Sequence, residues 1–224
     1  MTYAPKVIYQ DDYILALNKP PGMDVEALRD WISKNFHFPI SNDYSLRSGI
    51  AHRLDKPTSG VILVAKEKNV FYKLQEEFAE RNVNKTYVAL VHGRVDLSKQ
   101  GYGEVNAPVG RLPWKRTRFG VHEGGRTAVT RYKVLGYYEI EGEDFTLLEI
   151  YPKTGRTHQI RVHLKYIGHP IVSDSLYAGR KTLRKDLKLF PRLWLHAKSI
   201  EFVHPVTGER MKLEASLPQE IKLN

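Results

Sequence analysis

Strand-like segments recur along this chain without a regular alternation of strands and helices. A repeated strand–helix–strand pattern would indicate a parallel sheet covered by helices on both faces. The pattern here instead favours an α+β fold, in which helices flank a largely antiparallel mixed sheet. With 224 residues and no repeat or long linker, the chain is long enough to bury a core as one domain over residues 1–224.

The expected strands are short apolar runs or alternating segments, at residues 7–9, 14–18, 61–65, 85–92, 128–135, 145–151, 198–203 and 210–214. The last two form a hairpin around Thr207-Gly208. Three helices are expected from apolar spacings of three and four residues. They cover residues 24–36 with Asp24 as the cap, residues 67–80, and a segment capped by Thr157 and ended by Gly168.

The net charge of +10 is concentrated in two segments. Residues 110–133 hold seven basic residues and one acidic residue, an excess of six positive charges. Residues 180–188 hold five basic residues and one acidic residue, an excess of four, so the two segments together account for the whole net charge. A concentrated positive charge suits a polyanion, because phosphate contacts release counterions. Trp114 and Phe119 could stack on unpaired bases there. The open alternative is a solvated basic loop.

Several classes of protein are disfavoured. The chain has no cysteine, which excludes disulfides and thiolate metal sites. It has no apolar run long enough to cross a bilayer and no secretion signal, so we expect no membrane partner and a cytoplasmic location. His158, His163 and His169 would lie on different faces of a helix, so we expect no metal site and attribute them to structural hydrogen bonds.

A constrained loop is expected at residues 52–60, His-Arg-Leu-Asp-Lys-Pro-Thr-Ser-Gly, just before a buried strand. Pro57 and Gly60 impose an irregular backbone on Asp55, and functional side chains often lie on such loops. From spacing alone, an Asp in this position is more often a cap or turn residue than a catalytic one.

This segment resembles, residue for residue, the HRLD-x-x-TSG signature of RluA-type pseudouridine synthases. Further segments resemble the family's other motifs in the expected order: residues 18–22 (Asn-Lys-Pro-Pro-Gly), residues 85–91, residues 154–164 (Thr-Gly-Arg-Thr-His-Gln-Ile-Arg-Val-His-Leu), residues 168–171, residues 195–197 and His204-Pro205. The resemblance covers residues 7–216. It implies two halves around a central active-site cleft, and isomerisation of specific uridines in structured RNA with base flipping.

The family reaction breaks the bond between uracil nitrogen and ribose and reattaches the base through carbon. Atoms and electrons balance within the substrate, so no cofactor is expected. The resemblance makes Asp55 the catalytic residue, and an ionised carboxylate can serve as the nucleophile. Attack on the sugar and assistance to loss of the base both remain open, as does the group that moves the protons. The resemblance makes Arg161 the partner that keeps the Asp55 carboxylate ionised, and Tyr87 the aromatic residue against the base.

The resemblance also places Ile160 beneath the base and assigns Arg53 to the space that the flipped uridine leaves. The remaining expected substrate-binding residues are His52, Lys115, Arg116 and Arg118.

The chain departs from the family in two places. No segment precedes residue 7 that could be the ribosomal-protein-type RNA-binding domain of larger members, so we expect that domain to be absent. Met23-Asp24-Val25 replaces the short His-Pro segment found after Gly22 in many relatives.

Other functions are less well supported. The sister group acting on small-subunit ribosomal RNA usually has Gly rather than His before its Arg-Leu-Asp. A non-catalytic RNA-binding protein would not need Asp55, Tyr87 and Arg161 together. A hydrolase is disfavoured because residues 58–60 lack a nucleophile elbow, and no P-loop motif is present. Ribosomal and transfer RNA both remain open as substrates, and we expect a monomer.

Overall fold

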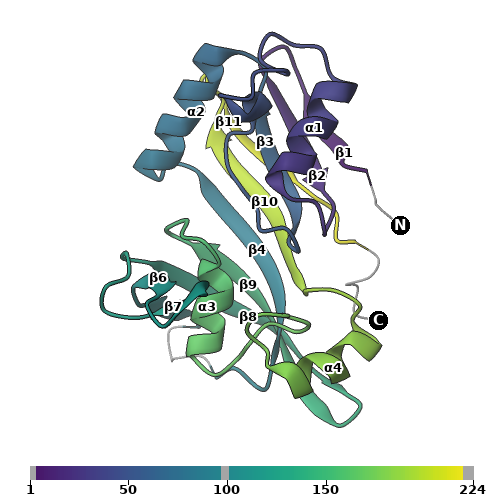
Figure 1. Cartoon of the computed structure of the whole chain (residues 1–224), viewed down its shortest axis with the longest axis vertical. Coiled ribbons are helices and arrows are strands. Elements are labelled where there is room, and N and C mark those ends of the chain that lie inside the picture. Colours follow the sequence, from purple (N-terminus) through teal and green to yellow (C-terminus); the bar gives the residue numbers. More distant parts are fainter. Residues whose placement is uncertain (1–3, 97–100, 219–224) are drawn as a thin grey trace. The chain divides into compact units, whose positions relative to one another are not determined.

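The computed structural model describes residues 4–96 and 101–218, apart from the side chain of Arg116. Its helices are α1 (Val25–Asn35), α2 (Lys68–Glu80), α3 (Gln159–Tyr166) and α4 (Arg180–Leu189), with a short 3-10 helix at Arg47–Gly49 (Figure 1). Its strands are β1 (Lys6–Gln10), β2 (Ile14–Lys19), β3 (Ser59–Ala65), β4 (Asn84–His92), β5 (Gly103–Asn106), β6 (Val109–Leu112), β7 (Lys115–Val121), β8 (Val129–Ile140), β9 (Glu143–Pro152), β10 (Leu195–Val203) and β11 (Arg210–Glu214).

Within the described residues, nine strands form one mixed sheet in the order β1-β2-β3-β10-β4-β9-β8-β5, with β11 paired to β10, while β6 and β7 form a separate hairpin. The predicted α+β class is therefore confirmed. Contacts group the chain into two compact units. The first contains the residues up to Lys85 together with Ala197–Leu217, and the second contains Thr86–His196. The chain crosses between them within β4 and within β10, and a single domain over residues 1–224 stays a prediction.

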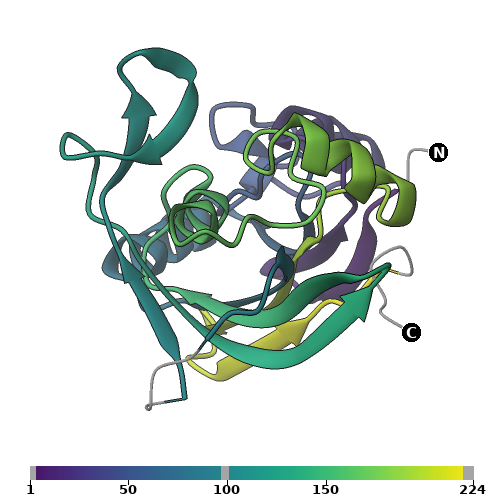
Figure 2. The same ribbon diagram turned by 90° about the horizontal axis from the view of Figure 1, so that it is seen from below.

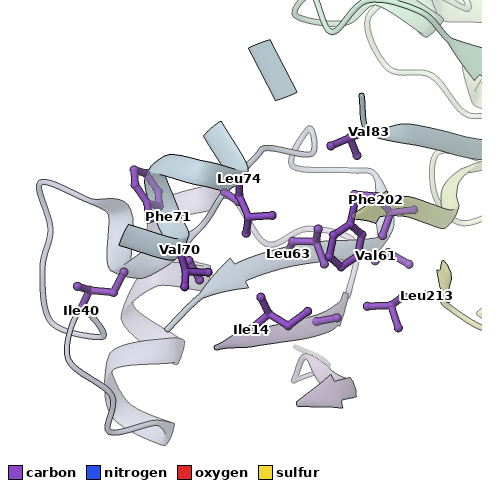
Figure 3. Close-up of a cluster of buried hydrophobic side chains, with 14 of the residues drawn as sticks. Ile14, Ile40, Val61, Leu63, Val70, Phe71, Leu74, Val83, Phe202 and Leu213 are labelled. Carbon is purple, nitrogen blue, oxygen red and sulfur yellow. The ribbon is translucent and has the colours of Figure 1, made fainter. Parts of the chain in front are cut away.

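In the first unit, β2 and β3 are buried on both faces. Their antiparallel register places Ile14 opposite Ala65 and Leu17 opposite Ile62. Ile14 and Leu63 point to the side covered by α2, where Val70, Phe71 and Leu74 complete a cluster (Figure 3). The alternate residues of the same strands face α1 instead, where they pack with Leu28 and Ile32. Burial of each such side chain stabilises the fold by about 1.5–3 kcal/mol.

Helix α1 begins where the sequence predicts. The side chain of Asp24 accepts a hydrogen bond from the backbone N–H of Ala27 at 3.0 Å, which satisfies one of the unpaired donors of the first turn. Leu28 and Ile32 are its buried residues, one turn apart on the face toward the sheet. The predicted cap and apolar face of this helix are therefore confirmed.

In the second unit, β4, β9, β8 and β5 pair antiparallel. Strands β8 and β9 form a long hairpin closed by Glu141 and Gly142, both at positive φ, as a tight two-residue turn requires. Helix α3 lies on one face of this hairpin and against β7 (Figure 2). Val162 of α3 is buried there with Val109, Ala128 and Tyr177.

Candidate active site

Asp55 lies on a tight turn between the 3-10 helix and β3. Its backbone carbonyl accepts from the N–H of Thr58 at 3.0 Å, so Pro57 occupies the inside of a closed four-residue turn. The next carbonyl, that of Lys56, accepts from the N–H of Gly22 at 2.8 Å. The backbone that directly follows the Asp55 side chain is thus fixed by two hydrogen bonds, and the predicted constrained loop is present.

Lys19 ties the segment after β2 to the Asp55 turn. Its side chain is buried, and its ammonium donates to the carbonyls of Pro20 at 2.9 Å, Met23 at 2.8 Å and Lys56 at 3.4 Å. A buried ammonium is tolerated only when its N–H groups are satisfied, so these carbonyls must stay together. The 18–22 motif and the Asp55 motif, separate in the sequence, are therefore joined through the Lys19 ammonium and the Gly22 N–H.

His52 holds the start of the same loop. Its Nε2 accepts from the backbone N–H of Leu63 at 3.0 Å, so its other ring nitrogen carries the proton. Its ring centroid lies 4.8 Å from that of Phe78. Burial, with a smaller contribution from the charge of Lys85, lowers the pKa of His52 to about 3. These contacts explain His52 as a neutral structural residue, whereas contact with RNA stays a prediction.

Two further contacts hold this loop. Gln75 of α2 donates to the carbonyl of Ala51, and the Ala51 N–H donates to the carbonyl of Leu63. At the other end, Gly60 has φ +119°, and a Cβ there would stand 2.2 Å from the carbonyl oxygen of Ala197. Only glycine fits such an approach of β3 to β10. Arg53, next to His52, is exposed.

Tyr87, Ile160 and Arg161 all lie in the second unit. Tyr87 is almost buried on β4, where it pairs with Ile150 of β9. Ile160 and Arg161 are both buried in the first turn of α3. Asp55, His52 and Arg53 belong to the first unit.

The start of α3 is fixed by Gln159. Its amide donates to the Val129 carbonyl and to the Thr130 hydroxyl, each at 3.0 Å, and its oxygen accepts from the N–H of Arg156 at 3.0 Å and from the Thr154 hydroxyl. The N-cap is His158 in the left-handed conformation, without a side-chain cap bond. The predicted cap Thr157 is therefore wrong, because Gln159 links the helix to β8 and pulls its start one residue further along the chain.

Arg161 forms a bidentate ion pair with Asp174. Its Nε and Nη2 donate to the two carboxylate oxygens, each at 2.8 Å, and both side chains are at most 2% exposed. Asp174 also accepts from the backbone N–H groups of Leu176 and Tyr177 at 2.9 and 3.1 Å. The Tyr177 ring centroid lies 5.1 Å from the guanidinium carbon. This arrangement fixes the plane of the guanidinium, and the sequence motifs did not identify Asp174.

The three histidines noted in the sequence each hydrogen-bond within the protein. Nδ1 of His158 lies 2.9 Å from the Tyr177 hydroxyl. His163 donates from Nε2 to the carbonyl of Ala107 at 2.9 Å, so its Nδ1 accepts from the Thr130 hydroxyl. Burial lowers the pKa of His163, consistent with a neutral ring. His169 donates from Nδ1 to the carbonyl of His92 at 2.8 Å.

The basic segment 110–133 divides into two parts. On β8, Arg131 pairs with Glu104 at 2.6 Å and Lys133 with Glu149 at 2.8 Å, so these charges are neutralised within the sheet. The β6–β7 hairpin carries Lys115, which is exposed, and Arg118, which is half-buried. Neither of them forms an ion pair with a described residue, and the side chain of Arg116 lies outside the described residues.

Aromatic side chains accompany this charge. Trp114, at the turn between β6 and β7, is 76% exposed. Phe119 lies beneath the guanidinium of Arg111 and edge-on to His158 of the α3 cap. A basic hairpin with an exposed aromatic tip can contact phosphates and stack on a base.

The RNA pseudouridylate synthase family model matches residues 13–166, which include the Asp55 turn, Tyr87 and Arg161. The chain belongs to this family. As an RNA pseudouridine synthase it is an isomerase, and the RNA-modifying activity implied by its motifs is confirmed.

Curated relatives of this synthase cover nearly all of the chain. Ribosomal large subunit pseudouridine synthase D of Pseudomonas aeruginosa is 38% identical in an alignment of 230 positions, gaps included, that covers 96% of this chain and 69% of the relative. An uncharacterized RNA pseudouridine synthase of Bacillus subtilis, YlyB, is also 38% identical, over 96% of this chain and 70% of its own length.

Solved structures agree with the synthase fold. Human RNA pseudouridylate synthase domain containing 1 superimposes with a TM-score of 0.80 at 26% identity, covering 97% of this chain and 85% of the human one. Human RNA pseudouridylate synthase domain containing 4 gives 0.71 at 25% identity, covering 96% and 89%. Within residues 4–96 and 101–218 of this synthase, no helix has the length and apolar character needed to cross a membrane.

Proposed function

We propose that this synthase isomerises specific uridines in ribosomal RNA of the large subunit, with Asp55 as its nucleophile. The proposal of this substrate rests on the 38% identity, over 96% of the chain, to a synthase named for the large ribosomal subunit. Two further relatives with this name, from Pasteurella multocida and Salmonella typhimurium, are each 36% identical over the same share.

The position of Asp55 suits a nucleophile. Its backbone is held by the Thr58 turn and by the Lys56–Gly22 bond, so the carboxylate is presented from a fixed point without rearrangement. The reaction exchanges a nitrogen–ribose bond for a carbon–ribose bond, and the base exchanges a carbon-bound proton for a nitrogen-bound one. As the nucleophile, the Asp55 carboxylate forms a transient covalent bond with the substrate and is released again when the carbon–ribose bond is made.

Arg161 acts as the positively charged partner of the Asp55 carboxylate in the reaction. A guanidinium remains charged at any working pH, and the bidentate bond to Asp174 holds its plane fixed. Tyr87 stacks on the uracil and takes part in proton transfer, and Ile160 supports the base from below. Tyr87 and Ile160 are held on regular elements, β4 and α3, which suits residues that must define a pocket.

RNA binding uses Arg53 and the β6–β7 hairpin. Arg53 is exposed beside the fixed His52, so it can enter the space left by a flipped uridine and offset part of the few kcal/mol lost in unstacking. Lys115, Arg116 and Arg118 contact phosphates. Arg131 and Lys133 contribute less, because Glu104 and Glu149 already neutralise them.

The test is a map of pseudouridine at single-nucleotide resolution in total RNA from cells with and without this protein. We expect loss of one or a few sites in large-subunit ribosomal RNA, restored by the wild type and by Asp12→Asn but not by Asp55→Asn. Asp12 is a matched control, because it is an exposed Asp outside every proposed site.

The other outcomes reject separate parts of the proposal. Loss of sites in transfer RNA alone would reject the ribosomal substrate. Restoration by Asp55→Asn would reject Asp55 as nucleophile. If no site changed in cells and purified protein modified neither ribosomal nor transfer RNA, a non-catalytic RNA-binding protein would be the better account.

A further inference from the structure

Helix α4 presents a face made only of basic residues. Arg180, Arg184 and Lys188 recur every four residues, so they form one row about 12 Å long, and Lys181 and Lys185 lie directly beside it. All five are exposed. Lys185 pairs with Glu143 at 2.7 Å, whereas the other four form no ion pair with any described residue.

The opposite face of α4 is anchored by a single acid. Asp186 is buried and accepts from the N–H of Ser173 at 2.7 Å, and its carboxylate lies 3.1 Å from Nε2 of His92. The helix end is fixed by the Ser173 hydroxyl, which donates to the carbonyl of Phe190 at 2.6 Å. The basic row is therefore held on a rigid support, and little backbone entropy would be lost when a ligand binds.

This arrangement reduces the stability of the helix itself. Arg180 and Lys181 lie in the first turn, where the helix dipole disfavours positive charge, and no acid is present there. The pairs 180/184, 184/188 and 181/185 repel one another at a spacing that costs about 0.2–0.5 kcal/mol each. A row of like charges destabilises the helix that carries it. The binding of a polyanionic ligand would explain why such a row is present.

We propose that this face of α4 is a second RNA-contact surface, which binds the phosphate backbone of the RNA substrate without reading its bases. The inference rests on the proposed function and extends it, because none of the residues assigned to the isomerisation lies on α4. A basic row without aromatic side chains matches phosphates rather than bases.

An anionic lipid surface is the less suitable occupant. A helix that lies on a membrane needs one continuous apolar face beside its basic one. The exposed apolar residues of α4 are Leu187 and Leu189, which stand about 160° apart around the axis and so form no such face.

The test compares two triple variants with the wild type. The α4 variant neutralises the row by the substitutions Arg180→Gln, Arg184→Gln and Lys188→Gln. The control variant removes the same charge from exposed positions of the first unit by Lys6→Gln, Lys34→Gln and Lys68→Gln. Binding to unmodified large-subunit RNA fragments is measured at several salt concentrations. We expect the α4 variant to bind about tenfold more weakly near 0.1 M salt, with a salt slope reduced by about three.

The control variant should keep the wild-type slope to within about one. Thermal unfolding of both variants verifies folding, and relief of like-charge repulsion should leave the α4 variant at least as stable as the wild type. Equal slopes for the two variants would overturn the inference. So would α4-dependent binding to phosphatidylserine vesicles with unchanged RNA binding. Failure of the proposed function is separate, since it would appear as wild-type protein that makes no pseudouridine.

Discussion

The Arg161–Asp174 pair holds a guanidinium at the start of α3 with almost no access to water. Such a pair is a poor source of net stability, because desolvation offsets much of the attraction between the charges. Its value lies in the geometry that it imposes, since two parallel hydrogen bonds fix the plane of the guanidinium. We therefore expect Asp174 to be a positioning residue for Arg161 as well as a structural one.

Replacement of Asp174 by Asn should lower the free energy of unfolding by about 3 kcal/mol or more, because the buried guanidinium of Arg161 loses the carboxylate that holds it in a bidentate ion pair. Urea denaturation measures this change. Asp144→Asn is the matched control, since Asp144 pairs with Arg94 at 3.5 Å with both side chains exposed. That variant should lose less than about 1 kcal/mol. Equal losses in the two variants would contradict the account.

His52 should make the protein sensitive to acid. Its pKa is about 3 in the folded protein against 6.5 for an unperturbed histidine, so between these values the unfolded chain binds a proton that the folded one does not. The contribution of neutral His52 to the free energy of unfolding is fully present above pH 6.5. It is lost as the pH falls toward 3, at up to about 1.4 kcal/mol per pH unit. The lowered pKa of His163 acts in the same direction.

The expected result is a shallower fall in unfolding free energy between pH 6.5 and 3 for His52→Gln than for the wild type. Denaturant unfolding at a series of pH values gives the slopes. His37→Gln, at an exposed position, should retain the wild-type slope. A His52→Gln slope equal to that of the wild type would show that His52 titrates normally in the folded protein.

At the scale of elements, the predicted segments are those that bury an apolar face. α1 and α2 were predictable because their buried residues recur every three or four positions, and β2 and β3 because each is a short, continuous apolar run. α4 was not predicted, since its buried residue is Asp186 and no apolar stripe marks it. β5 and β6 have four residues each, too few for a period to be visible. The outer half of β8 continues to Ile140 through half-exposed residues, so its predicted end at residue 135 was too early.

The β6–β7 hairpin should be the principal basic element in RNA binding. Reversal of charge with Lys115→Glu, Arg116→Glu and Arg118→Glu should weaken RNA affinity at least tenfold near 0.1 M salt and flatten its salt dependence. Filter binding at several salt concentrations measures both quantities. The control variant changes the net charge equally by Lys6→Glu, Lys34→Glu and Lys68→Glu. Its effect on RNA affinity should be much smaller. Unchanged affinity in the hairpin variant would place the RNA-binding surface elsewhere.

At the scale of the whole molecule, the family and its motifs were predictable from the sequence, and the supporting residues were not. The motif residues lie in both units, with Asp55 in the first and Tyr87 and Arg161 in the second. Asp174 is thirteen positions beyond Arg161, and neither its burial nor its partner follows from any local pattern. The left-handed start of α3 at His158 likewise depends on the link from Gln159 to β8, which is a tertiary interaction.

The central claim is that the carboxylate of Asp55 carries out the isomerisation. The most direct measurement is a single-turnover assay of purified protein on unmodified large-subunit ribosomal RNA, comparing the wild type with Asp55→Asn and Asp12→Asn. We expect the wild type and Asp12→Asn to form pseudouridine at similar rates. Asp55→Asn should bind the RNA with unchanged affinity and the same salt dependence but form no detectable product. Substantial turnover by Asp55→Asn would contradict the account.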